Sequence, residues 1–383
     1  MNVIKNIIKT NKTIYYMYNI IFSFFYRFIG LFVKTDKYLI LFNSFGGKKY
    51  DDSPYALYQY MKKNKKYNKY KMIWAVDNPI VFGDEKVDYV KNNSFKFFTT
   101  ALKAKYWITN SSMERGLKIK KKGTIYINTW HGSVIKKIDL KTDRMNFRVT
   151  PPDYYCAQSN LDIDYFSEKW KYPKNKILLS GYPRNDELCN VKQDEINRIK
   201  QKLGIPLDKK IILYAPTFRD NDYDINGCYI KPPMDLKKWR KELSNKYIMV
   251  FRAHYEINNS LNIVEDDFIK NYSDYPRLNE LLKISDILIS DYSSIMIDYS
   301  ILERPIFCFA YDYDKYQKER GTAYDLRKEL PNGITTNEDD LIIQIKNCDY
   351  NNERIKTKSF KDKHVEVCGN AVSFIDDIIK EEK

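Results

Sequence analysis

Short apolar segments alternate with polar, helix-like stretches along the chain after Lys37. This alternation predicts strand–helix units built around parallel sheets, and therefore an α/β fold. The first series of predicted strands is Tyr38–Phe42, Lys71–Val76, Tyr106–Thr109, Thr124–Ile127, Tyr154–Ala157 and Ile177–Ser180. The second series is Ile211–Tyr214, Tyr247–Phe251, Phe268–Lys270, Ile287–Ile289 and Ile306–Phe309. The two series of strands therefore predict two Rossmann-like halves.

The boundary between the halves is expected near residues 190–208, where a charged stretch ends in Gly204-Ile205-Pro206. We therefore assign residues 37–200 to a first domain and 201–383 to a second, leaving open whether the last helix packs back on the first domain. In two facing domains of this kind, ligands bind in the cleft at the carboxyl ends of the strands. Residues that directly follow strands are therefore the candidates for chemistry.

Residues 1–36 contain a strongly apolar and aromatic run, Ile14–Val33, which Arg27 interrupts and lysines flank on both sides. Its length just spans a bilayer. The internal arginine, the tyrosines and the missing charge asymmetry favour a helix that lies in the membrane interface. A single span and a helix buried on the protein remain the alternatives.

The composition narrows the class of partner and of reaction. Lys and Arg number 65 against 50 Asp and Glu, a formal charge of +15, which favours nucleic acid, anionic lipid or phosphate-rich substrates. The glycine-rich, P-loop, nucleophile-elbow and zincin motifs are absent, which argues against dehydrogenases, P-loop enzymes, hydrolases and zinc proteases. The six cysteines form no C-x-x-C pair and there are three histidines, so no metal site is expected.

His131 directly follows a predicted strand, in the segment Thr129-Trp-His-Gly132. Gly132 permits a close backbone approach, and Lys136 and Lys137 supply positive charge a few residues later. These features make His131 a candidate for acid–base chemistry, although many histidines are only structural.

His254 also follows a predicted strand, and Arg252 precedes it. The stretch from Ser290 through Ser293 and Ser294 is typical of a strand, a tight turn and a helix, whose first amides are suited to a phosphate. An ordinary helix cap is the alternative interpretation. Asp298, one turn further on, is a candidate for ribose or base contact.

Two more arginines follow strands, a position suited to phosphate binding. Arg219 ends the segment Ala215-Pro-Thr-Phe-Arg219, which includes Thr217, and Arg184 lies in Gly181-Tyr-Pro-Arg-Asn-Asp186. Three Asp-x-Asp triplets, at 162–164, 222–224 and 312–314, are weak indications of a metal in so Asp-rich a chain.

The ordered set of these motifs resembles the CDP-glycerol glycerophosphotransferase family of teichoic acid synthesis over roughly residues 38–375. The motifs are Thr129–Gly132, Gly181–Asp186, Tyr214–Arg219, Arg252–His254, Ser290–Ser294 and Arg304-Pro305. The resemblance implies a GT-B fold with an acceptor-binding first half and a CDP-binding second half. It also implies that His131 and His254 act in catalysis and that Ser293 and Ser294 bind the donor phosphate. The chain departs from the family pattern at Tyr255 and Cys368.

The implied reaction is attack of an acceptor hydroxyl on the phosphorus that carries glycerol, with release of CMP and without a cofactor. His131 is the expected base. His254, Arg252, Ser293 and Ser294 are expected to hold the diphosphate, with Thr217, Arg219 and Asp298 as further donor-side residues. Gly132, Lys136, Lys137 and Arg184 are assigned to the acceptor side. The roles of the two histidines are interchangeable at this stage.

The expected partners are CDP-glycerol or CDP-ribitol, a polyprenyl diphosphate-linked saccharide and an anionic membrane surface on the cytoplasmic side. A nucleotide-sugar glycosyltransferase with paired Rossmann domains is the nearest rival. A basic, membrane-bound nucleic-acid-binding protein is the non-enzymatic rival, but no nucleic-acid motif is present. The sequence leaves the polyol, the acceptor polymer, the number of units added and the oligomeric state open.

Overall fold

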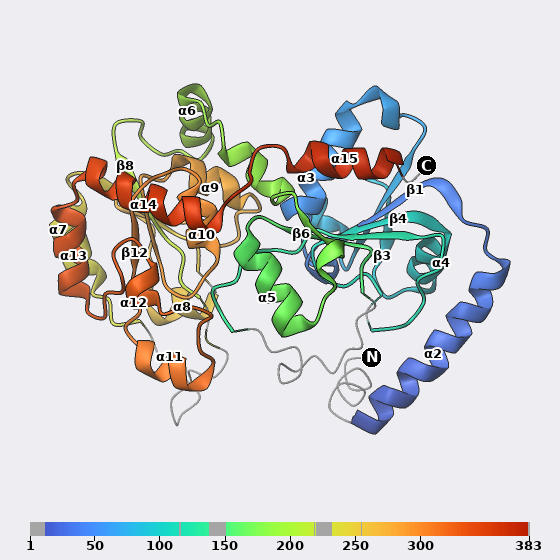
Figure 1. The fold of residues 1–383 in the computed structure, drawn as a ribbon. Coiled ribbons are helices and arrows are strands. Elements are labelled where there is room, and N and C mark those ends of the chain that lie inside the picture. Colours follow the sequence, from blue (N-terminus) through green and yellow to red (C-terminus); the bar gives the residue numbers. More distant parts are fainter. Residues whose placement is uncertain are drawn as a thin grey trace. The chain divides into compact units, whose positions relative to one another are not determined.

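The computed structural model describes residues 12–114, 116–137, 151–217, 219, 232–253 and 255–381. These residues form an α/β structure with two parallel sheets (Figure 1). The chain divides into two compact units. The first unit comprises the described residues up to His131, those from 151 to Asp186 and those from Val367 onward. The second comprises Gly132–Lys137 and the described residues between Glu187 and Glu366. The sequence-based division at residue 200 therefore differs from the structural one at 186.

The sheet of the first unit has seven strands in the order β3-β2-β1-β4-β5-β6-β7, and every neighbouring pair is parallel. The strands are β1 (Asp36–Asn43), β2 (Lys71–Val76), β3 (Tyr89–Lys91), β4 (Ala104–Thr109), β5 (Ile125–Asn128), β6 (Tyr154–Ala157) and β7 (Ile177–Leu179). All six predicted strands are present. Strand β3 was not predicted, because only Val90 of its three residues is buried and so no apolar run marks it.

Alternate strand residues of the first sheet pack on opposite helical layers. Ile40, Phe42 and Trp74 pack on the face covered by α3 (Asp52–Lys63) and α15 (Ala371–Glu381). Leu39 and Leu41 pack on the other face, which is covered by α4 (Phe95–Lys103) and one side of α2 (Lys12–Phe32). The unit also contains α5 (Asn160–Trp170) and short 3-10 turns at Phe45–Gly47, Lys65–Tyr67, Pro79–Phe82 and Lys174–Lys176, and the 3-10 turn Pro183–Leu188 begins in this unit and ends in the second. Both faces of the sheet are therefore buried, as a parallel sheet requires.

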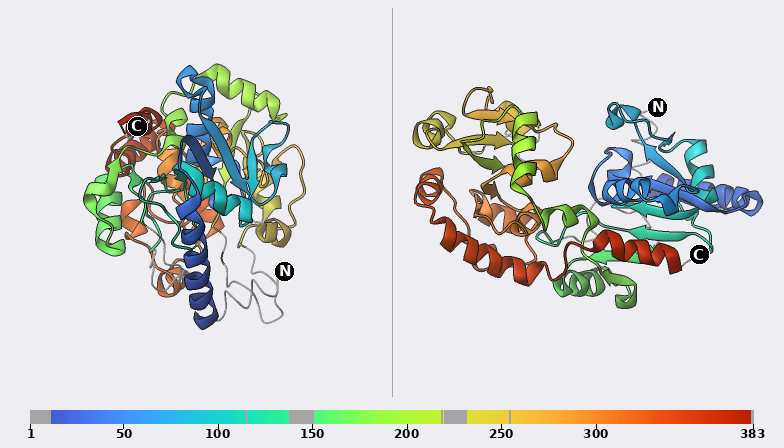
Figure 2. Two further views of the ribbon diagram at one scale, coloured as in Figure 1. Left: turned by 90° about the vertical axis from the view of Figure 1, so that its right-hand side faces the viewer. Right: turned by 90° about the horizontal axis from the view of Figure 1, so that it is seen from above.

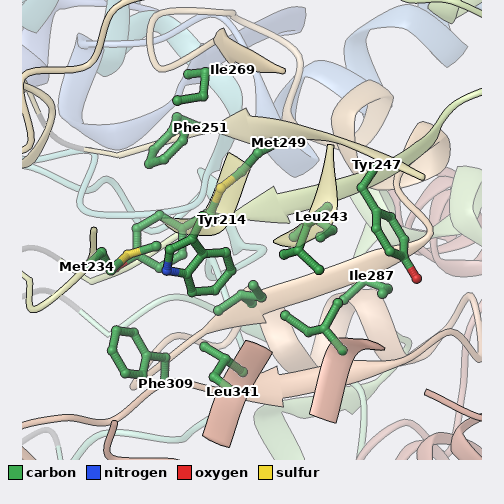
Figure 3. Close-up of a cluster of buried hydrophobic side chains, with 14 of the residues drawn as sticks. Tyr214, Met234, Leu243, Tyr247, Met249, Phe251, Ile269, Ile287, Phe309 and Leu341 are labelled. Carbon is green, nitrogen blue, oxygen red and sulfur yellow. The ribbon is translucent and has the colours of Figure 1, made fainter. Parts of the chain in front are cut away.

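The sheet of the second unit has five strands in the order β10-β9-β8-β11-β12, again all parallel. They are β8 (Lys210–Tyr214), β9 (Tyr247–Phe251), β10 (Ile269–Asn271), β11 (Ile287–Ser290) and β12 (Ile306–Cys308), so all five predicted strands are present. Figure 3 shows the core on one face, where Tyr214, Met249 and Phe251 lie with Leu243 and Leu341. The helices on that face are α7 (Leu236–Leu243), α8 (Tyr255–Ser260) and α13 (Glu338–Lys346).

Further helices complete the second unit. Contacts join α9 to β8, α10 to β11 and β12, α14 to α10, and α6 to α9. Their bounds are α6 (Gln193–Lys202), α9 (Leu278–Ile284), α10 (Ile295–Ser300), α11 (Tyr313–Glu319), α12 (Leu326–Glu329) and α14 (Tyr350–His364).

Both sheets reverse their strand order at one point, between β1 and β4 in the first and between β8 and β11 in the second. Loops that leave adjacent strands on either side of such a reversal turn in opposite directions and leave an opening at the carboxyl ends of the strands. Each unit therefore has one preferred place for a ligand, and the loops after these four strands line it.

The predicted N-terminal helix is present as α2, which packs beside α4 (Figures 1 and 2). Tyr26 is buried against Phe98, with ring centroids 4.4 Å apart, and Ser23 accepts a hydrogen bond from the backbone N–H of Lys118 at 2.9 Å. The opposite side of α2 exposes large apolar residues. Among the described helices, none has the length and apolar character that crossing a bilayer requires.

The C-terminal helix α15 belongs to the first unit (Figure 1), and its residue Asp376 bonds to other parts of that unit. Its carboxylate, only 3% exposed, accepts hydrogen bonds from Lys66, from the Tyr67 hydroxyl and, at 3.1 Å, from the Tyr60 hydroxyl. Burial by itself raises the pKa of this carboxyl, but Lys66, Tyr67 and Lys380 outweigh it and lower the pKa below its ordinary value. The ionised form of Asp376 is therefore favoured in the folded state.

We predict that Asp376→Ala lowers the free energy of unfolding by about 2–3 kcal/mol, because Lys66 and two hydroxyls lose a buried partner. Asp377→Ala is the matched control, since Asp377 is 64% exposed. Because the folded-state pKa is lowered, the contribution of Asp376 is present above its unfolded pKa of about 3.9 and is lost as the pH falls. Urea denaturation at neutral and acidic pH measures both effects. Equal stability of the two variants at neutral pH would contradict the prediction.

Candidate active site

The loops after β1, β4 and β5 are joined by hydrogen bonds at the strand reversal of the first unit. The Asn110 side chain accepts from the backbone N–H of Phe45 at 2.8 Å and donates to the Ser44 hydroxyl at 3.3 Å. The Asn128 side chain donates to the Ser111 carbonyl at 2.7 Å and accepts from the Trp130 N–H at 2.9 Å. The backbone that leads to His131 is therefore held by two buried amides.

His131 is fixed in one tautomer by this framework. Its Nδ1 lies 2.7 Å from the carbonyl oxygen of Asn110. Because a carbonyl oxygen can only accept, Nδ1 carries the proton and the lone pair of the neutral ring is on Nε2. The ring packs on Trp130, with centroids 4.0 Å apart, and lies 5.8 Å from the ring of Phe45. His131 is therefore an oriented base that remains exposed to solvent.

Three non-glycine residues near His131 have left-handed backbone conformations. The φ angles are +46° at Phe45, +68° at Asp52 and +54° at Trp130. Such conformations are unfavourable for residues with a side chain, and they concentrate where function constrains the backbone. Their position beside the strand reversal supports the assignment of this region as a site.

Arg184 and Asp52 form a buried ion pair near His131. The Nη1 atom of Arg184 lies 3.4 Å from both carboxylate oxygens of Asp52, and its guanidinium lies over the ring of Tyr182. Surrounding protein lowers the pKa of His131 from its ordinary value of 6.5; the Asn110 carbonyl and Asp52 oppose this shift, and Arg184 adds to it.

The other residues assigned to the acceptor side, Gly132, Lys136 and Lys137, belong to the second unit. The backbone of Lys136 pairs with that of Thr322, and the N–H of Lys137 donates to the Gly321 carbonyl at 3.1 Å. Lys137 is exposed and Lys136 is partly exposed. These two lysines are therefore grouped with a different unit from His131 and Arg184.

In the second unit, the loops after β8 and β11 are joined at the strand reversal. The Ser290 hydroxyl donates to the Ala215 carbonyl at 2.7 Å, and the Thr217 N–H donates to a carboxylate oxygen of Asp291 at 2.8 Å. The Oγ1 atom of Thr217 is buried and has no hydrogen-bond partner among the described residues. A buried hydroxyl without a partner is unusual and is consistent with a ligand-binding position.

Ser293 and Ser294 lie in the turn that leads from β11 to α10. The Ser293 hydroxyl accepts from the Ile295 N–H at 3.3 Å, whereas the Ser294 side chain makes no capping bond. In the described part of the chain, no acceptor is bonded to the backbone N–H groups of these two serines. Asp298 is buried on α10. Among the described residues, the predicted anion site therefore has two N–H groups without a bonded acceptor, and Ser293 acts partly as a cap.

The two predicted donor-side arginines are already bonded to protein groups. Arg252 lies at the end of β9, where its backbone N–H donates to the Tyr214 carbonyl and its Nη1 donates to the Tyr275 carbonyl at 2.5 Å. Arg219 is buried between Asp291 and Asp312. His254 lies outside the described residues.

The described residues contain no group of three or more His, Cys, Asp or Glu side chains suited to a metal ion. Of the Asp-x-Asp triplets, 222–224 lies outside the described residues. Asp162 is buried and accepts from the Tyr182 hydroxyl at 3.0 Å, and Asp312 pairs with Arg219.

Four residues at these strand reversals were not predicted as site residues from the sequence: Asn110, Asp52, Asp291 and Asp312. Asn110 and Asp291 directly follow β4 and β11, so their position after strands was the available signal. Asp52 and Asp312 carried no such signal. They reach the site through ion pairs with residues that are distant in sequence, at separations of 132 and 93 positions.

We predict that Asp52→Asn lowers the pKa of His131, because the Asp52 carboxylate favours the imidazolium and its loss leaves Arg184 without this counterion. Titration of the imidazole Cε1–H resonances by NMR measures the pKa, and the chain has three histidines to assign. Asp84→Asn, at an exposed site in the same unit, is the control. An unchanged or raised pKa in Asp52→Asn would disprove the proposed coupling.

Comparison with known proteins gives the family. The sequence profile of CDP-Glycerol:Poly(glycerophosphate) glycerophosphotransferase matches residues 24–373. The chain is 37% identical to a teichoic acid glycerol-phosphate transferase of Staphylococcus aureus, over 85% of this chain and 87% of the relative. It is 34% identical to a teichoic acid poly(glycerol phosphate) polymerase of Bacillus spizizenii, over 95% of this chain and 93% of the relative. A polymerase of the same kind from Staphylococcus epidermidis is 36% identical, but the matched region spans only 55% of that longer protein.

The solved structures agree. The wall teichoic acid polymerase TagF superimposes with a TM-score of 0.83 at 34% identity, covering 98% of this chain and 97% of that chain. A histidine-to-asparagine variant of TagF soaked with CDPG also superimposes with a TM-score of 0.83. The profile match covers most of the chain, and the relatives share its parallel α/β fold. The chain therefore belongs to the CDP-Glycerol:Poly(glycerophosphate) glycerophosphotransferase family.

Proposed function

We propose that this chain transfers glycerol phosphate from CDP-glycerol to a lipid-linked teichoic acid or capsular polymer precursor and releases CMP. As a member of its family, it is a glycerophosphotransferase that uses CDP-glycerol as donor. The acceptor is our inference. The observation that carries it is the similarity, over nearly the full length of both chains, to proteins of teichoic acid synthesis.

In the proposed mechanism, a hydroxyl of the acceptor attacks the phosphorus that carries glycerol, and the bond from this phosphorus to the bridging oxygen of the diphosphate breaks. The hydroxyl proton passes to Nε2 of His131. The proton on Nδ1 stays bonded to this nitrogen and donates to the Asn110 carbonyl oxygen. The imidazolium therefore forms without a change of ring orientation. CMP leaves with the bonding electron pair. No covalent enzyme intermediate, cofactor or metal is part of this proposal.

Charge on the departing CMP would be stabilised from the second unit. The backbone N–H groups of Ser293 and Ser294 and the buried hydroxyl of Thr217 are the proposed donors to the diphosphate. His254 and Arg252 are proposed to add positive charge, and Asp298 to contact the nucleoside. On the acceptor side, Gly132, Lys136, Lys137 and Arg184 are proposed to lie near the lipid-linked diphosphate and its sugar.

The direct test incubates purified protein with a synthetic polyprenyl diphosphate-linked disaccharide and CDP-glycerol, CDP-ribitol or a UDP-sugar, and measures released nucleotide and product mass. CMP and a product heavier by glycerol phosphate are expected. Preference for CDP-ribitol would show that the transferred polyol is ribitol and not glycerol. Release of a nucleoside diphosphate from the UDP-sugar alone would identify a glycosyltransferase instead.

We predict that His131→Ala and His254→Ala each lower turnover by at least about a hundredfold, as expected for a lost base or a lost charge-stabilising group. His364→Gln is the matched control. His364 is buried and bonded to Glu329, away from both strand reversals in sequence, and its replacement should leave turnover close to that of the wild type. Near-normal turnover in folded His131→Ala would remove this residue from the mechanism.

We also propose that α2 holds the enzyme on an anionic membrane surface, at the cytoplasmic face where a lipid-linked acceptor is made. Its exposed apolar residues include a stripe opposite buried Tyr26, at positions 17, 21, 24, 28 and 31, and further exposed apolar residues flank this stripe. Phe24 is 74% exposed and Leu31 is 79% exposed. Exposed Lys34 follows this helix in sequence, and exposed Lys118 contacts it through Ser23; both lysines suit anionic lipid.

The membrane proposal predicts that replacing Phe24, Phe28 and Leu31 together by serine lowers binding to vesicles of phosphatidylglycerol and phosphatidylcholine by at least about tenfold, because apolar area no longer enters the lipid. Vesicle co-sedimentation measures the bound fraction. Val264→Ser, at an exposed apolar residue of the second unit, is the control. Equal binding of the triple variant and the wild type would rule out α2 as the lipid-binding surface.

A further inference from the structure

Arg219 lies at the strand reversal of the second unit with its guanidinium between two carboxylates. Its Nη1 donates to Asp291 at 2.7 Å. Its Nε and Nη2 donate to the two oxygens of Asp312 at 2.8 and 2.9 Å, the two-point arrangement that arginine makes with a carboxylate. A further bond from Nη1 reaches the Thr217 carbonyl. At least four of the five N–H groups of this guanidinium are therefore bonded to described residues of the protein.

Tyrosine rings enclose the pair of carboxylates and the arginine. The guanidinium lies 5.0 Å from the ring centroid of Tyr292 and 5.1 Å from that of Tyr311. Tyr292 is fully buried, stacks on Tyr316 at 3.6 Å, and donates its hydroxyl to Asp312 at 2.7 Å. Two carboxylates against one guanidinium leave this cluster with a net charge of −1. A diphosphate would have to displace a carboxylate and approach a net negative charge to reach Arg219.

The same cluster connects the two loops that carry the proposed donor site. One oxygen of Asp291 accepts from the Thr217 N–H at 2.8 Å and from the Tyr292 N–H at 2.6 Å, while the other accepts from Arg219. Tyr292 directly precedes Ser293. Bonds of Asp291 therefore join the Thr217 segment to Tyr292 and the serine turn, in addition to the bond from the Ser290 hydroxyl to the Ala215 carbonyl.

We propose that Arg219, Asp291 and Asp312 are positioning residues that fix Thr217 and the Ser293–Ser294 turn for the donor diphosphate, and that Arg219 does not bind the phosphate itself. This inference rests on the proposed function, because it takes Thr217, Ser293 and Ser294 as the donor site. It also gives Asp312 a role other than metal binding. Both of its oxygens are bonded to Arg219 or Tyr292, whereas Asp314, in the same triplet, is 82% exposed and pairs with Arg327.

The burial of these charges is consistent with a positioning role. A buried ion pair returns little net stability, because desolvation of the ions offsets their attraction, but it strongly favours one geometry over others. Arg219, Asp291 and Asp312 are buried or nearly so, at 7%, 2% and 12% side-chain exposure. Lysine at position 219 keeps the charge but cannot bond both oxygens of Asp312 from two parallel N–H groups.

The experiment compares Asp312→Asn, Arg219→Lys and the control Asp314→Asn in the full-length enzyme. CDP affinity is measured by calorimetry, and KM and kcat for CDP-glycerol are measured by CMP release. Positioning predicts that Asp312→Asn and Arg219→Lys each weaken CDP binding by at least about tenfold, the size expected for lost charged hydrogen bonds. KM should rise more than kcat falls, and Asp314→Asn should match the wild type.

Direct phosphate binding by Arg219 predicts a different pattern. Asp312→Asn would then release the guanidinium and bind CDP as tightly as the wild type or more tightly, and this result would overturn the inference. Tyr292→Phe removes only the hydroxyl bond to Asp312, so it provides a milder variant if Asp312→Asn does not fold. Positioning predicts a smaller loss of CDP affinity in Tyr292→Phe, and unchanged affinity would count against it. Failure of the wild type to release CMP would refute the proposed function instead.

Discussion

Parallel pairing of the strands is the constraint on which the rest of this structure depends. Every neighbouring strand pair in both sheets is parallel, so all carboxyl ends of a sheet lie along one edge. Reversal of the strand order beside β1 and beside β8 then leaves one opening along each edge. The strand order alone therefore places the residues that follow these strands close to one another. His131 and Asn110 meet in this way in the first unit, and Thr217 and Asp291 do so in the second.

The two sites use polar groups in different ways. In the first unit, neutral amides of Asn110 and Asn128 hold the loops, and this leaves the imidazole of His131 oriented and exposed. In the second unit, two carboxylates and an arginine hold the loops, and tyrosine rings enclose them. A site that binds a dianionic diphosphate would be expected to avoid buried carboxylates. Their presence is understandable if they act on the loops rather than on the ligand, because the guanidinium between them compensates one of their two negative charges and both carboxylates are bonded to protein groups.

Sequence reasoning found the strands well because each buried strand is a short apolar run, and it missed only β3, where a single residue is buried. It selected His131, Thr217 and the serine turn as candidates because position after a strand is a local property, and their roles stay predictions. The same reasoning assigned Arg219 to the diphosphate. An arginine after a strand looks identical whether its partner is a phosphate or a carboxylate, and Asp312 lies 93 residues away.

By itself, the sequence determined the α/β class, both sets of parallel strands, the family and the histidine after β5, because these depend on local hydrophobic periodicity and on ordered motifs. Only the tertiary structure decided which polar groups face one another. It joined Asp52 to Arg184 near His131, enclosed Arg219 between two carboxylates, and grouped Lys136 and Lys137 with the second unit. Such pairings form between residues that lie far apart along the chain. Their energies depend on burial and on distances of a few ångströms, which no local pattern encodes.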